Sequence, residues 1–293
     1  MDRIINFNKP SGISSHQAVT RIKRLLVVKK AGHTGTLDPL ATGILLVCLG
    51  EATKGARFFL DMDKEYRARV KLGERTDTYD SHGSIIERKD FTSVTETGLL
   101  DAVMMFKGKI GQKPPMYSAV KISGETLYKL ARKGIEIDRP ERSVEIYDIA
   151  VQGVDLPYFD LVVSCSKGTY LRSLCDDIGM RLGTGAHLVA LERTRIGIFD
   201  IKDAATFDDI ERKDFWLDEK SHSSVDAALS GLKGILLERA DYEKAKNGVQ
   251  LISEKASGFY DNEYVKLRDP WGNLFGIGRI QQGIIRIERI LNL

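Results

Sequence analysis

The stretch from Gly32 to Gly43 (GHTGTLDPLATG) holds the residues of this chain that are best suited to chemistry. Its glycines allow backbone turns that other residues do not adopt, and they let a ligand approach the chain closely. Asp38 stands directly before Pro39, which biases its backbone to an extended conformation. A carboxylate in such a stiff loop, followed by an apolar strand, is well placed to act on a bound molecule. It is also suited to cap a turn, and the spacing alone favours that structural role.

An arginine at the start of a predicted helix needs a partner of opposite charge. The segment after Thr169 has the apolar stripe of a helix, with Thr169 as its expected N-cap and Gly183 as its expected end. Arg172 then falls in the first turn, where the helix dipole disfavours a cation by about 0.3–1 kcal/mol. We therefore expect a compensating anion, either an acidic side chain at the surface or a buried carboxylate from elsewhere in the fold.

Tyr66 belongs to a segment whose apolar and polar residues alternate strictly. The stretch from Tyr66 to Leu72 predicts a strand with one buried face, and Tyr66 lies on that face. The simplest interpretation is a tyrosine that forms part of the core. The alternative is an aromatic platform on which a nucleobase stacks.

Lysines and arginines gather in two parts of the chain. Between Arg3 and Leu37 seven of them occur without an acidic residue. From Lys107 to Glu145 nine stand against five acidic residues, and two tyrosines lie among them. Basic residues interleaved with aromatic ones are typical of a surface that binds nucleic acid. A solvated helix face and a plain surface insertion explain the same two segments about equally well.

The composition of the 293-residue chain is that of an ordinary globular protein, and its net charge of +3 identifies no partner. Its three cysteines form no CxxC pair and its five histidines show no metal-ligand spacing, so we expect no metal. The longest apolar run, Ile44–Leu49, is too short to cross a bilayer, and no signal-peptide pattern is present. Phosphate-binding and dinucleotide motifs are absent from the sequence. We therefore expect a cytoplasmic protein without a cofactor or membrane contact.

Hydrophobic periodicity predicts the elements that position these residues. Ser14 and Gln17 form a capping box that opens a helix. We expect strands at 3–7, 44–49, 66–72, 83–88, 144–153, 159–165 and 196–201, and further helices at 99–106, 127–131 and after Thr169. A polar bridge without a core pattern is expected from 202 to 224. The end of the chain predicts a small, mostly-β domain, with a helix at 239–246 and strands at 264–268, 274–280 and 284–290.

Six motifs in this order resemble those of the bacterial tRNA pseudouridine-55 synthases (TruB type), over residues 3 to 235. They lie at Asn8–Ser15, Gly32–Gly43, Lys64–Tyr66 with Leu72–Gly73, Pro114–Lys121 with Gly124 and Tyr128–Arg132, Gly168–Arg172, and His187–Gly197. A single motif of this kind is weak, whereas six in the right order are specific. Glu192 departs from the pattern because the family often has a basic residue there, a difference that bears on one RNA contact and leaves the chemistry in place.

The resemblance implies an α+β fold, in which a mixed β-sheet core is flanked by helices. Residues 1–235 would form the pseudouridine synthase catalytic domain, with an RNA-gripping insertion at 108–143. Residues 236–293 would form a small PUA-like domain. The implied reaction isomerises the uridine at position 55 in the T-loop of tRNA to pseudouridine by base flipping, with an essential aspartate and without a cofactor.

The resemblance also implies a role for each chemical residue discussed above. Asp38 would be the catalytic carboxylate, and Arg172 would pair with it and hold it ionised. Tyr66 would stack on the uracil ring and could assist removal of a proton from the ribose.

Further residues would bind the substrate around this centre. Tyr170 would form a hydrogen bond near the ion pair, and Leu191 would line the pocket. His33 would fill the space that the flipped base leaves, although its own surroundings indicate only a loop or capping histidine. The remaining residues expected to bind the RNA are Lys9, Lys64, Arg132 and Lys133.

Two other classes of function compete with a stand-alone enzyme. One is a non-catalytic RNA-binding protein or tRNA chaperone on the same scaffold, and the other is a guide-RNA-dependent synthase of the dyskerin type. The insertion and the short tail favour a stand-alone monomer that binds the T-arm and the acceptor-stem side of tRNA without a guide RNA. The sequence leaves open whether the reaction follows a nucleophilic or a glycal route, which further RNAs are targets, and how much the tail contributes.

Overall fold

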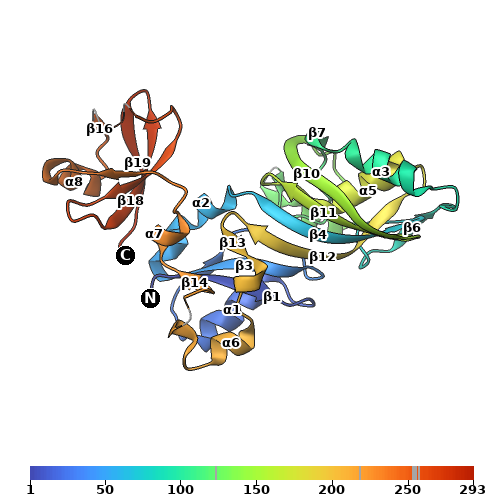
Figure 1. The fold of residues 1–293 in the computed structure, drawn as a ribbon, viewed down its shortest axis with the longest axis horizontal. Coiled ribbons are helices and arrows are strands. Elements are labelled where there is room, and N and C mark those ends of the chain that lie inside the picture. The colour runs from blue at the N-terminus through green and yellow to red at the C-terminus, as the bar shows by residue number, and fades with distance from the viewer. Residues whose placement is uncertain (123, 218, 253–255, 257) are drawn as a thin grey trace.

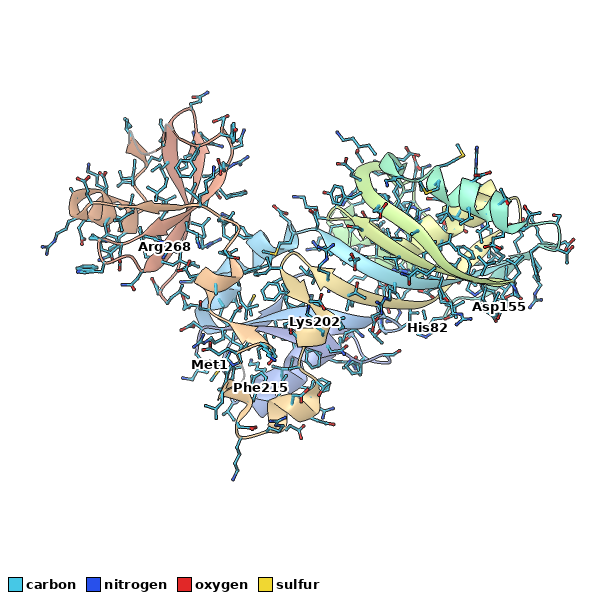
Figure 2. The ribbon with its side chains drawn as sticks, viewed as in Figure 1. Met1, His82, Asp155, Lys202, Phe215 and Arg268 are labelled. Carbon is cyan, nitrogen blue, oxygen red and sulfur yellow. The ribbon has the colours of Figure 1, made fainter. Side chains whose placement is uncertain are left out.

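The computed structural model describes residues 1–122, 124–217, 219–252, 256 and 258–293. Figure 1 shows a large twisted sheet with helices packed against it, and a second sheet near the C-terminus that stands apart. In Figure 2, side chains fill the space between these layers. The large sheet joins ten strands and the C-terminal sheet joins five. The predicted α+β class is confirmed.

The strands of the large sheet follow the order β14-β1-β3-β12-β4-β11-β10-β7, with β2 beside β3 and β13 beside β12. Their bounds are β1 (Ile4–Lys9), β2 (Ala31–His33), β3 (Thr42–Leu49), β4 (Lys64–Leu72), β7 (Gly108–Gln112), β10 (Arg142–Asp155), β11 (Tyr158–Cys165), β12 (Ala186–Ile196), β13 (Phe199–Asp200) and β14 (His222–Ser223). The C-terminal sheet has the order β15-β17-β18-β19-β16. It consists of β15 (Gly234–Leu236), β16 (Leu251–Ile252), β17 (Tyr264–Arg268), β18 (Leu274–Gln281) and β19 (Ile284–Ile290).

Two small hairpins and several short helices complete the secondary structure. The hairpins pair β5 (Glu74–Thr76) with β6 (Ile85–Arg88), and β8 (Lys121–Ile122) with β9 (Glu125–Thr126). The helices are α1 (Ser15–Leu25), α2 (Ala56–Leu60), α3 (Glu96–Met104), α4 (Leu127–Arg132), α5 (Leu171–Arg181), α6 (Phe207–Glu211), α7 (Val225–Ala228) and α8 (Arg239–Lys246), with 3₁₀ turns at Gly50–Gly55, Ile201–Asp203 and Phe215–Leu217. None of the helices in the described residues is long and apolar enough to cross a membrane.

A short parallel contact joins the two halves of the large sheet. β3 and β12 run parallel and pair Thr42 with Glu192 and Gly43 with Arg193, whereas the other strand pairs that the structure describes in this sheet are antiparallel. We call this contact the seam. The half that contains β4, β10 and β11 packs against α3 and α5, and the half that contains β1 and β3 has separate cores on its two faces. Burial of each large apolar side chain contributes about 1.5–3 kcal/mol. Leu37, Leu40 and Ala41 of the loop before β3 belong to the core of the β4, β10 and β11 half, so apolar packing also holds the two halves together.

The N-cap predicted for α1 is confirmed, and the one predicted for α5 is not. At α1, Ser14 and Gln17 form both hydrogen bonds of the predicted capping box. At α5, the predicted N-cap Thr169 is wrong, because its hydroxyl donates to the Ser166 carbonyl (3.0 Å) and the N-cap position falls to Tyr170. Gly183 follows the end of α5 with a φ of +77°, as predicted.

Two other predicted boundaries are wrong. The strand expected at 196–201 is displaced, because β12 already covers Ala186–Ile196 and a turn at Gly197 leads into the short β13. Buried polar side chains in β12 interrupt its apolar pattern and hide the strand. The polar bridge at 202–224 contains α6, which is too short to show helical periodicity, yet Phe207 and Ile210 are buried in a core beside β1.

The insertion and the C-terminal domain begin at slightly different residues than expected. β7 and the start of β10 pair antiparallel, with Gly108 opposite Ile146 and Gln112 opposite Arg142. The part of the chain that leaves the sheet is therefore confined to residues 113–141. The C-terminal sheet begins at Gly234, because β15 pairs with β17. Local apolar patterns do not mark either boundary, since both depend on pairing with distant strands.

The seam predicts a strict requirement for glycine at position 43. Gly43 has a φ of +97°, and a Cβ atom there would lie 2.3 Å from the Arg193 carbonyl oxygen on β12. We expect Gly43→Ala to lower the free energy of unfolding by about 3 kcal/mol or more, because it combines backbone strain with a clash that β12 cannot relieve. Urea unfolding measures this loss. Gly183→Ala is the control, since a Cβ atom at Gly183 meets open space and only the strain of its positive φ remains, about 1 kcal/mol. Equal losses in the two variants would contradict the argument.

Candidate active site

Asp38 lies on the loop between β2 and β3, which other side chains hold in place. The Ser15 hydroxyl accepts from the Leu37 amide (2.8 Å) and donates to the Leu37 carbonyl (3.0 Å). From the far side of the seam, Arg193 donates to the carbonyls of Ile44 (2.8 Å) and Gly35 (3.2 Å). Within the described residues, no backbone amide donates to the Asp38 carboxylate, so the turn-capping interpretation finds no support. The carboxylate points instead toward α5.

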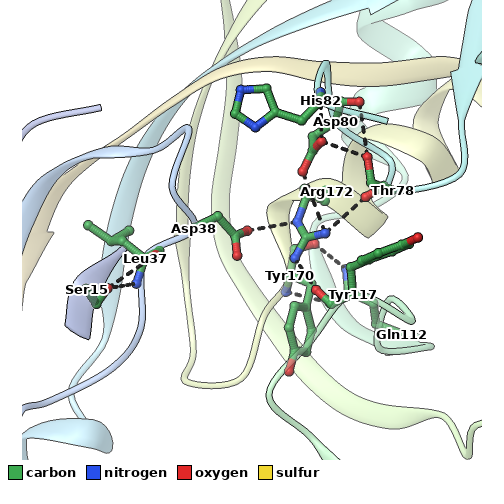
Figure 3. Close-up of polar contacts among 10 residues, drawn as sticks. All are labelled: Ser15, Leu37, Asp38, Thr78, Asp80, His82, Gln112, Tyr117, Tyr170 and Arg172. Atoms are coloured by element: carbon green, nitrogen blue, oxygen red, sulfur yellow. Dashed lines mark hydrogen bonds and ion pairs between the residues drawn. The ribbon is translucent and has the colours of Figure 1, made fainter. Parts of the chain in front are cut away.

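Arg172 is the partner of Asp38, as the helix-dipole argument requires. Its Nε lies 2.8 Å from Asp38 Oδ2, and its side chain is only 5% exposed. Figure 3 shows the guanidinium between several acceptors: Nη1 donates to the Thr78 carbonyl (3.0 Å) and Nη2 to the Tyr117 carbonyl (2.7 Å). An arginine bound by directional contacts on every side has one orientation, and it imposes that orientation on the carboxylate.

Asp80 is a residue of this site that the sequence did not reveal. The segment from Gly73 to Asp80 reads as a polar connection that is too acidic to bind a phosphate backbone. In the structure Asp80 is buried, and its Oδ2 lies 3.7 Å from Arg172 Nη1. Its other oxygen accepts from the Thr78 hydroxyl (2.7 Å) and the His82 amide (3.0 Å). Asp80 therefore holds Arg172 from the side opposite Asp38.

The charges around Asp38 act on its pKa in both directions. Burial raises the pKa of the Asp38 carboxyl, and the nearby Asp80 carboxylate adds to the rise. The Arg172 guanidinium and the Lys9 ammonium oppose it. Without Arg172 the balance would move further toward the protonated acid. The guanidinium thus has an electrostatic effect on Asp38 in addition to orienting it.

Asp38 opens onto a cavity of about 280 Å³ whose walls come from both halves of the sheet. Tyr66 on β4 and Leu191 on β12 line it together with Asp38 and Arg172, and both are only 8% exposed. Burial raises the pKa of the Tyr66 phenol, so its hydroxyl stays protonated. A planar ring that enters this cavity meets an aromatic face, an aliphatic side chain and one carboxylate.

Two lysines that were expected to bind RNA are buried and have other partners. Lys9 is 0% exposed and donates to the carbonyls of Pro10 (2.8 Å) and Ile13 (2.9 Å). Lys64 is 7% exposed and donates to the carbonyls of Leu60 (2.6 Å) and Met62. Burial lowers the pKa of each ammonium to about 8. The structure thus contradicts a phosphate contact for Lys9, and it gives Lys64 a place in the cavity wall with its charge satisfied by the backbone.

Tyr170 lines the same cavity as the ion pair without bonding to it, whereas His33 is not among the residues that line that cavity. Figure 3 shows the ring of Tyr170 directed away from the guanidinium, and no hydrogen bond among the described residues joins its hydroxyl to Asp38 or Arg172. The expected hydrogen bond of Tyr170 near the ion pair, as distinct from one to the pair itself, stays a prediction. His33 ends β2, and its Nδ1 is buried without a hydrogen-bond partner. Burial lowers the pKa of His33, which favours the neutral ring.

The insertion presents basic and aromatic side chains to solvent on α4. Arg132 and Lys133 are exposed, and the Arg132 guanidinium lies 5.9 Å from the centre of the half-exposed Tyr128 ring. Lys133 forms a surface ion pair with Glu125 (3.6 Å), which contributes little in water. These two residues are thus available to a polyanion, in contrast to Lys9 and Lys64.

A second hollow of about 680 Å³ adjoins the cavity at Leu191. Arg67 and Glu192 are among its lining residues, with Arg67 Nη1 3.9 Å from Glu192 Oε2. Glu192 therefore faces the groove beside the site and partly neutralises an exposed arginine.

Comparisons with known proteins give matches over most of the chain. Two family models match consecutive segments, the N-terminal domain of TruB family pseudouridylate synthase over residues 23–171 and the C-terminal domain of tRNA pseudouridylate synthase B over residues 172–237. The chain is 46% identical over 255 residues to tRNA pseudouridine synthase B of Clostridium tetani, with 87% of each chain covered. It is 38% identical over 292 residues to the protein of the same name from Clostridium acetobutylicum, with 99% of this chain and 100% of the relative covered. Among solved structures, a Cbf5–Nop10–Gar1 complex matches with a TM-score of 0.76 and 26% identity, covering 98% of this chain and 84% of the other.

Proposed function

Because the chain belongs to the TruB family of pseudouridylate synthases and is an isomerase that converts a uridine of tRNA to pseudouridine, we propose that its target is the T-loop uridine at position 55 and that Asp38 is the catalytic carboxylate. The observation that carries the proposal is the Asp38–Arg172 ion pair at 2.8 Å on the wall of a cavity that Tyr66 and Leu191 also line. The uracil ring of the uridine can stack on Tyr66 in this cavity, and the Asp38 carboxylate can then attack or orient the nucleoside.

The cavity requires that the uridine leave its stack before it reacts. Flipping a nucleotide out of a folded RNA costs a few kcal/mol. Stacking of the uracil on Tyr66 returns about 1–3 kcal/mol, and Leu191 closes on the other face. His33, neutral and without a partner for Nδ1, is the proposed side chain that fills the vacated position.

The chemistry then rests on an ionised Asp38. The N-glycosidic bond of the flipped uridine breaks, the uracil turns, and a carbon of the ring joins the ribose in place of the nitrogen. The product has the same atoms as the substrate, so the proposal needs no co-substrate and no cofactor. Arg172 and Lys9 favour the carboxylate form. Burial keeps the Tyr66 phenol protonated, so it can donate a hydrogen bond but is not the base that removes a proton from the ribose. A nucleophilic and a glycal route are both compatible with these positions.

We propose that the rest of the chain grips the tRNA around this centre. The catalytic domain extends to the start of β15 at Gly234, close to the expected boundary of 1–235, and its insertion approaches the T-arm. The remaining residues form a PUA-like domain on the acceptor-stem side, close to the expected range 236–293. The exposed basic and aromatic side chains of α4 support this role for the insertion. We further propose that a monomer acts alone, in contrast to the solved complex of Cbf5 with Nop10 and Gar1.

If the insertion binds phosphates of the tRNA, the affinity of the protein for tRNA depends on the salt concentration. We expect the logarithm of the tRNA association constant to fall linearly with the logarithm of the salt concentration, because bound phosphates release counterions. Arg132→Gln should weaken binding and reduce the slope by about 0.7–0.9. Titrations at several KCl concentrations measure both effects. Lys89→Gln, a change outside the insertion, is the control and should leave the slope unchanged; an unchanged slope in Arg132→Gln would count against a phosphate contact.

The experiment that tests the proposed function uses the purified protein and an isolated T-arm hairpin RNA. Pseudouridine is mapped by carbodiimide modification and reverse transcription. We expect modification at the T-loop uridine without any guide RNA, and none in a hairpin with cytidine at that position. Modification at another uridine would refute the proposed target. A strict need for an added guide RNA would refute the stand-alone enzyme.

A further inference from the structure

The residues at the start of the insertion, Gln112 to Tyr117, which we call its root, form hydrogen bonds with the first turn of α5 and its N-cap residue. This is the turn that carries Arg172. Gln112 is the last residue of β7, and the chain leaves the sheet immediately after it. Its side-chain Oε1 accepts from the Tyr170 amide (2.7 Å), and its Nε2 donates to the Tyr170 carbonyl (3.0 Å). Figure 3 shows this double contact below the guanidinium. A single side chain thus binds both backbone groups of the residue at the N-cap position of α5.

Two neighbouring contacts reinforce the same junction. The Ser173 hydroxyl donates to the Lys113 carbonyl (3.1 Å), and Arg172 Nη2 donates to the Tyr117 carbonyl (2.7 Å). Gln112, Lys113 and Tyr117 of the insertion therefore contact the N-cap residue Tyr170 and two residues of the first turn of α5, Ser173 and Arg172. Gln112 is 2% exposed and Ser173 is 4% exposed, so water does not compete for these bonds.

The start of α5 lacks the usual means of fixing a helix end. Tyr170 occupies the N-cap position without a side-chain cap, and the first turn carries no acidic residue. It carries instead a cation that the helix dipole disfavours at that place. Something outside the helix must hold this turn, and the amide of Gln112 is the group that the structure places there.

We propose that Gln112 is a positioning residue for the reaction: by holding the backbone of Tyr170, it aims Arg172 at Asp38. Gln112 touches neither the cavity nor the carboxylate, and it acts only through α5. The inference rests on the proposed role of Asp38. It also ties the placement of the RNA-gripping insertion to the orientation of the catalytic carboxylate, since the same few residues belong to both.

The test compares Gln112→Met, which keeps the length of the side chain and removes both hydrogen bonds, with the milder Ser173→Ala. Single-turnover pseudouridine formation in tRNA is measured across pH, together with tRNA affinity and urea stability. We expect Gln112→Met to lower the saturating rate constant by about 10- to 100-fold while affinity changes little, because a misplacement of about 1 Å has effects of this size. Ser173→Ala should show a smaller loss of the same kind.

The pH profile separates a positioning role from a merely structural one. Asp38 is surrounded by Arg172, Asp80 and Lys9, and of these only Arg172 is held by the junction. If Arg172 is no longer held in its orientation, the fall of the rate constant on the acid side of the pH–rate profile (the acid limb) should move to higher pH in both variants. Asn6→Leu is the control, since it removes one buried side-chain-to-backbone hydrogen bond (Asn6 Nδ2 to the Asp200 carbonyl, 2.9 Å) away from the site. It should lower stability without moving that limb.

Either of two results would overturn the inference. One is a wild-type rate constant in Gln112→Met, and the other is a lower rate with the acid limb unmoved. If Gln112→Met does not fold, Ser173→Ala decides by the same two criteria. If the wild-type protein itself forms no pseudouridine in the T-loop, the proposed function fails rather than the role of Gln112.

Discussion

Asp38→Asn is expected to abolish pseudouridine formation while leaving tRNA affinity nearly unchanged. The amide has the shape of the carboxylate and can still accept from Arg172, but it carries no charge and is a poor nucleophile and base. Loss of a group that acts on the substrate directly reduces the rate by at least about 10³–10⁴-fold. Single-turnover assays on tRNA with excess enzyme, together with filter binding, measure the two quantities separately.

A matched control for this variant is Asp77→Asn, because the Asp77 carboxylate accepts a backbone hydrogen bond from the Ser84 amide (2.9 Å) and, in the part of the chain that the structure describes, forms no ion pair with Arg172. It should retain wild-type turnover. Appreciable single-turnover product from Asp38→Asn would refute Asp38 as the catalyst. In that case the competing interpretation, an RNA-binding protein or tRNA chaperone on this scaffold, would gain weight.

Arg172→Met is expected to have the second-largest effect, a loss of about 10²–10³-fold or more in the single-turnover rate constant. Asp38 then loses both its orientation and the neighbouring positive charge that favours its ionised form. Since burial and Asp80 already raise the pKa of Asp38, removal of the guanidinium raises that pKa further. The reactive carboxylate is therefore lost at a higher pH as the solution is acidified, so the acid limb of the rate moves upward.

Arg172→Lys should recover little of this loss. An ammonium is a point charge on a flexible stem, and it cannot reach Asp38, Thr78 and Tyr117 together in the way that a planar guanidinium does. Stability should fall too, by about 3–5 kcal/mol in Arg172→Met, because Asp80 would be left buried without its cation. Arg268→Met, which breaks the pair between Arg268 on β17 and Asp226 on α7 (2.9 Å), is the control for stability effects without an active-site change. Wild-type turnover in Arg172→Lys would contradict the argument from geometry.

The parts of the site that could be predicted from sequence are those whose local setting is unusual. Asp38 stands in a glycine-flanked loop before a proline, and Arg172 stands where a helix disfavours a cation, so each suggests a partner. Asp80 has no such local mark. It lies in a polar connection, and its role comes from the fold, which brings that connection against α5.

Lys9 and Lys64 show the opposite case, in which a motif is present but the role differs. Both belong to motifs of the family, and a lysine in an RNA-binding protein suggests a phosphate contact. Whether its ammonium meets water or backbone carbonyls depends on how the chain folds over it, and here both ammonium groups are buried. Arg193 is similar, since its bonds to Gly35 and Ile44 exist only because the seam brings β12 against β3.

The seam also ties activity to the integrity of the whole large sheet. Asp38 comes from the half of the sheet that contains β3, whereas Tyr66, Arg172 and Leu191 come from the other half. The two halves share a core, because Leu37, Leu40 and Ala41 of the Asp38 loop pack among the apolar side chains of the other half. Local opening needs less free energy than global unfolding only where few contacts must break. Separating the catalytic groups must pull this loop out of the core, so heat or denaturant should silence the enzyme and reduce the circular dichroism signal in the same transition.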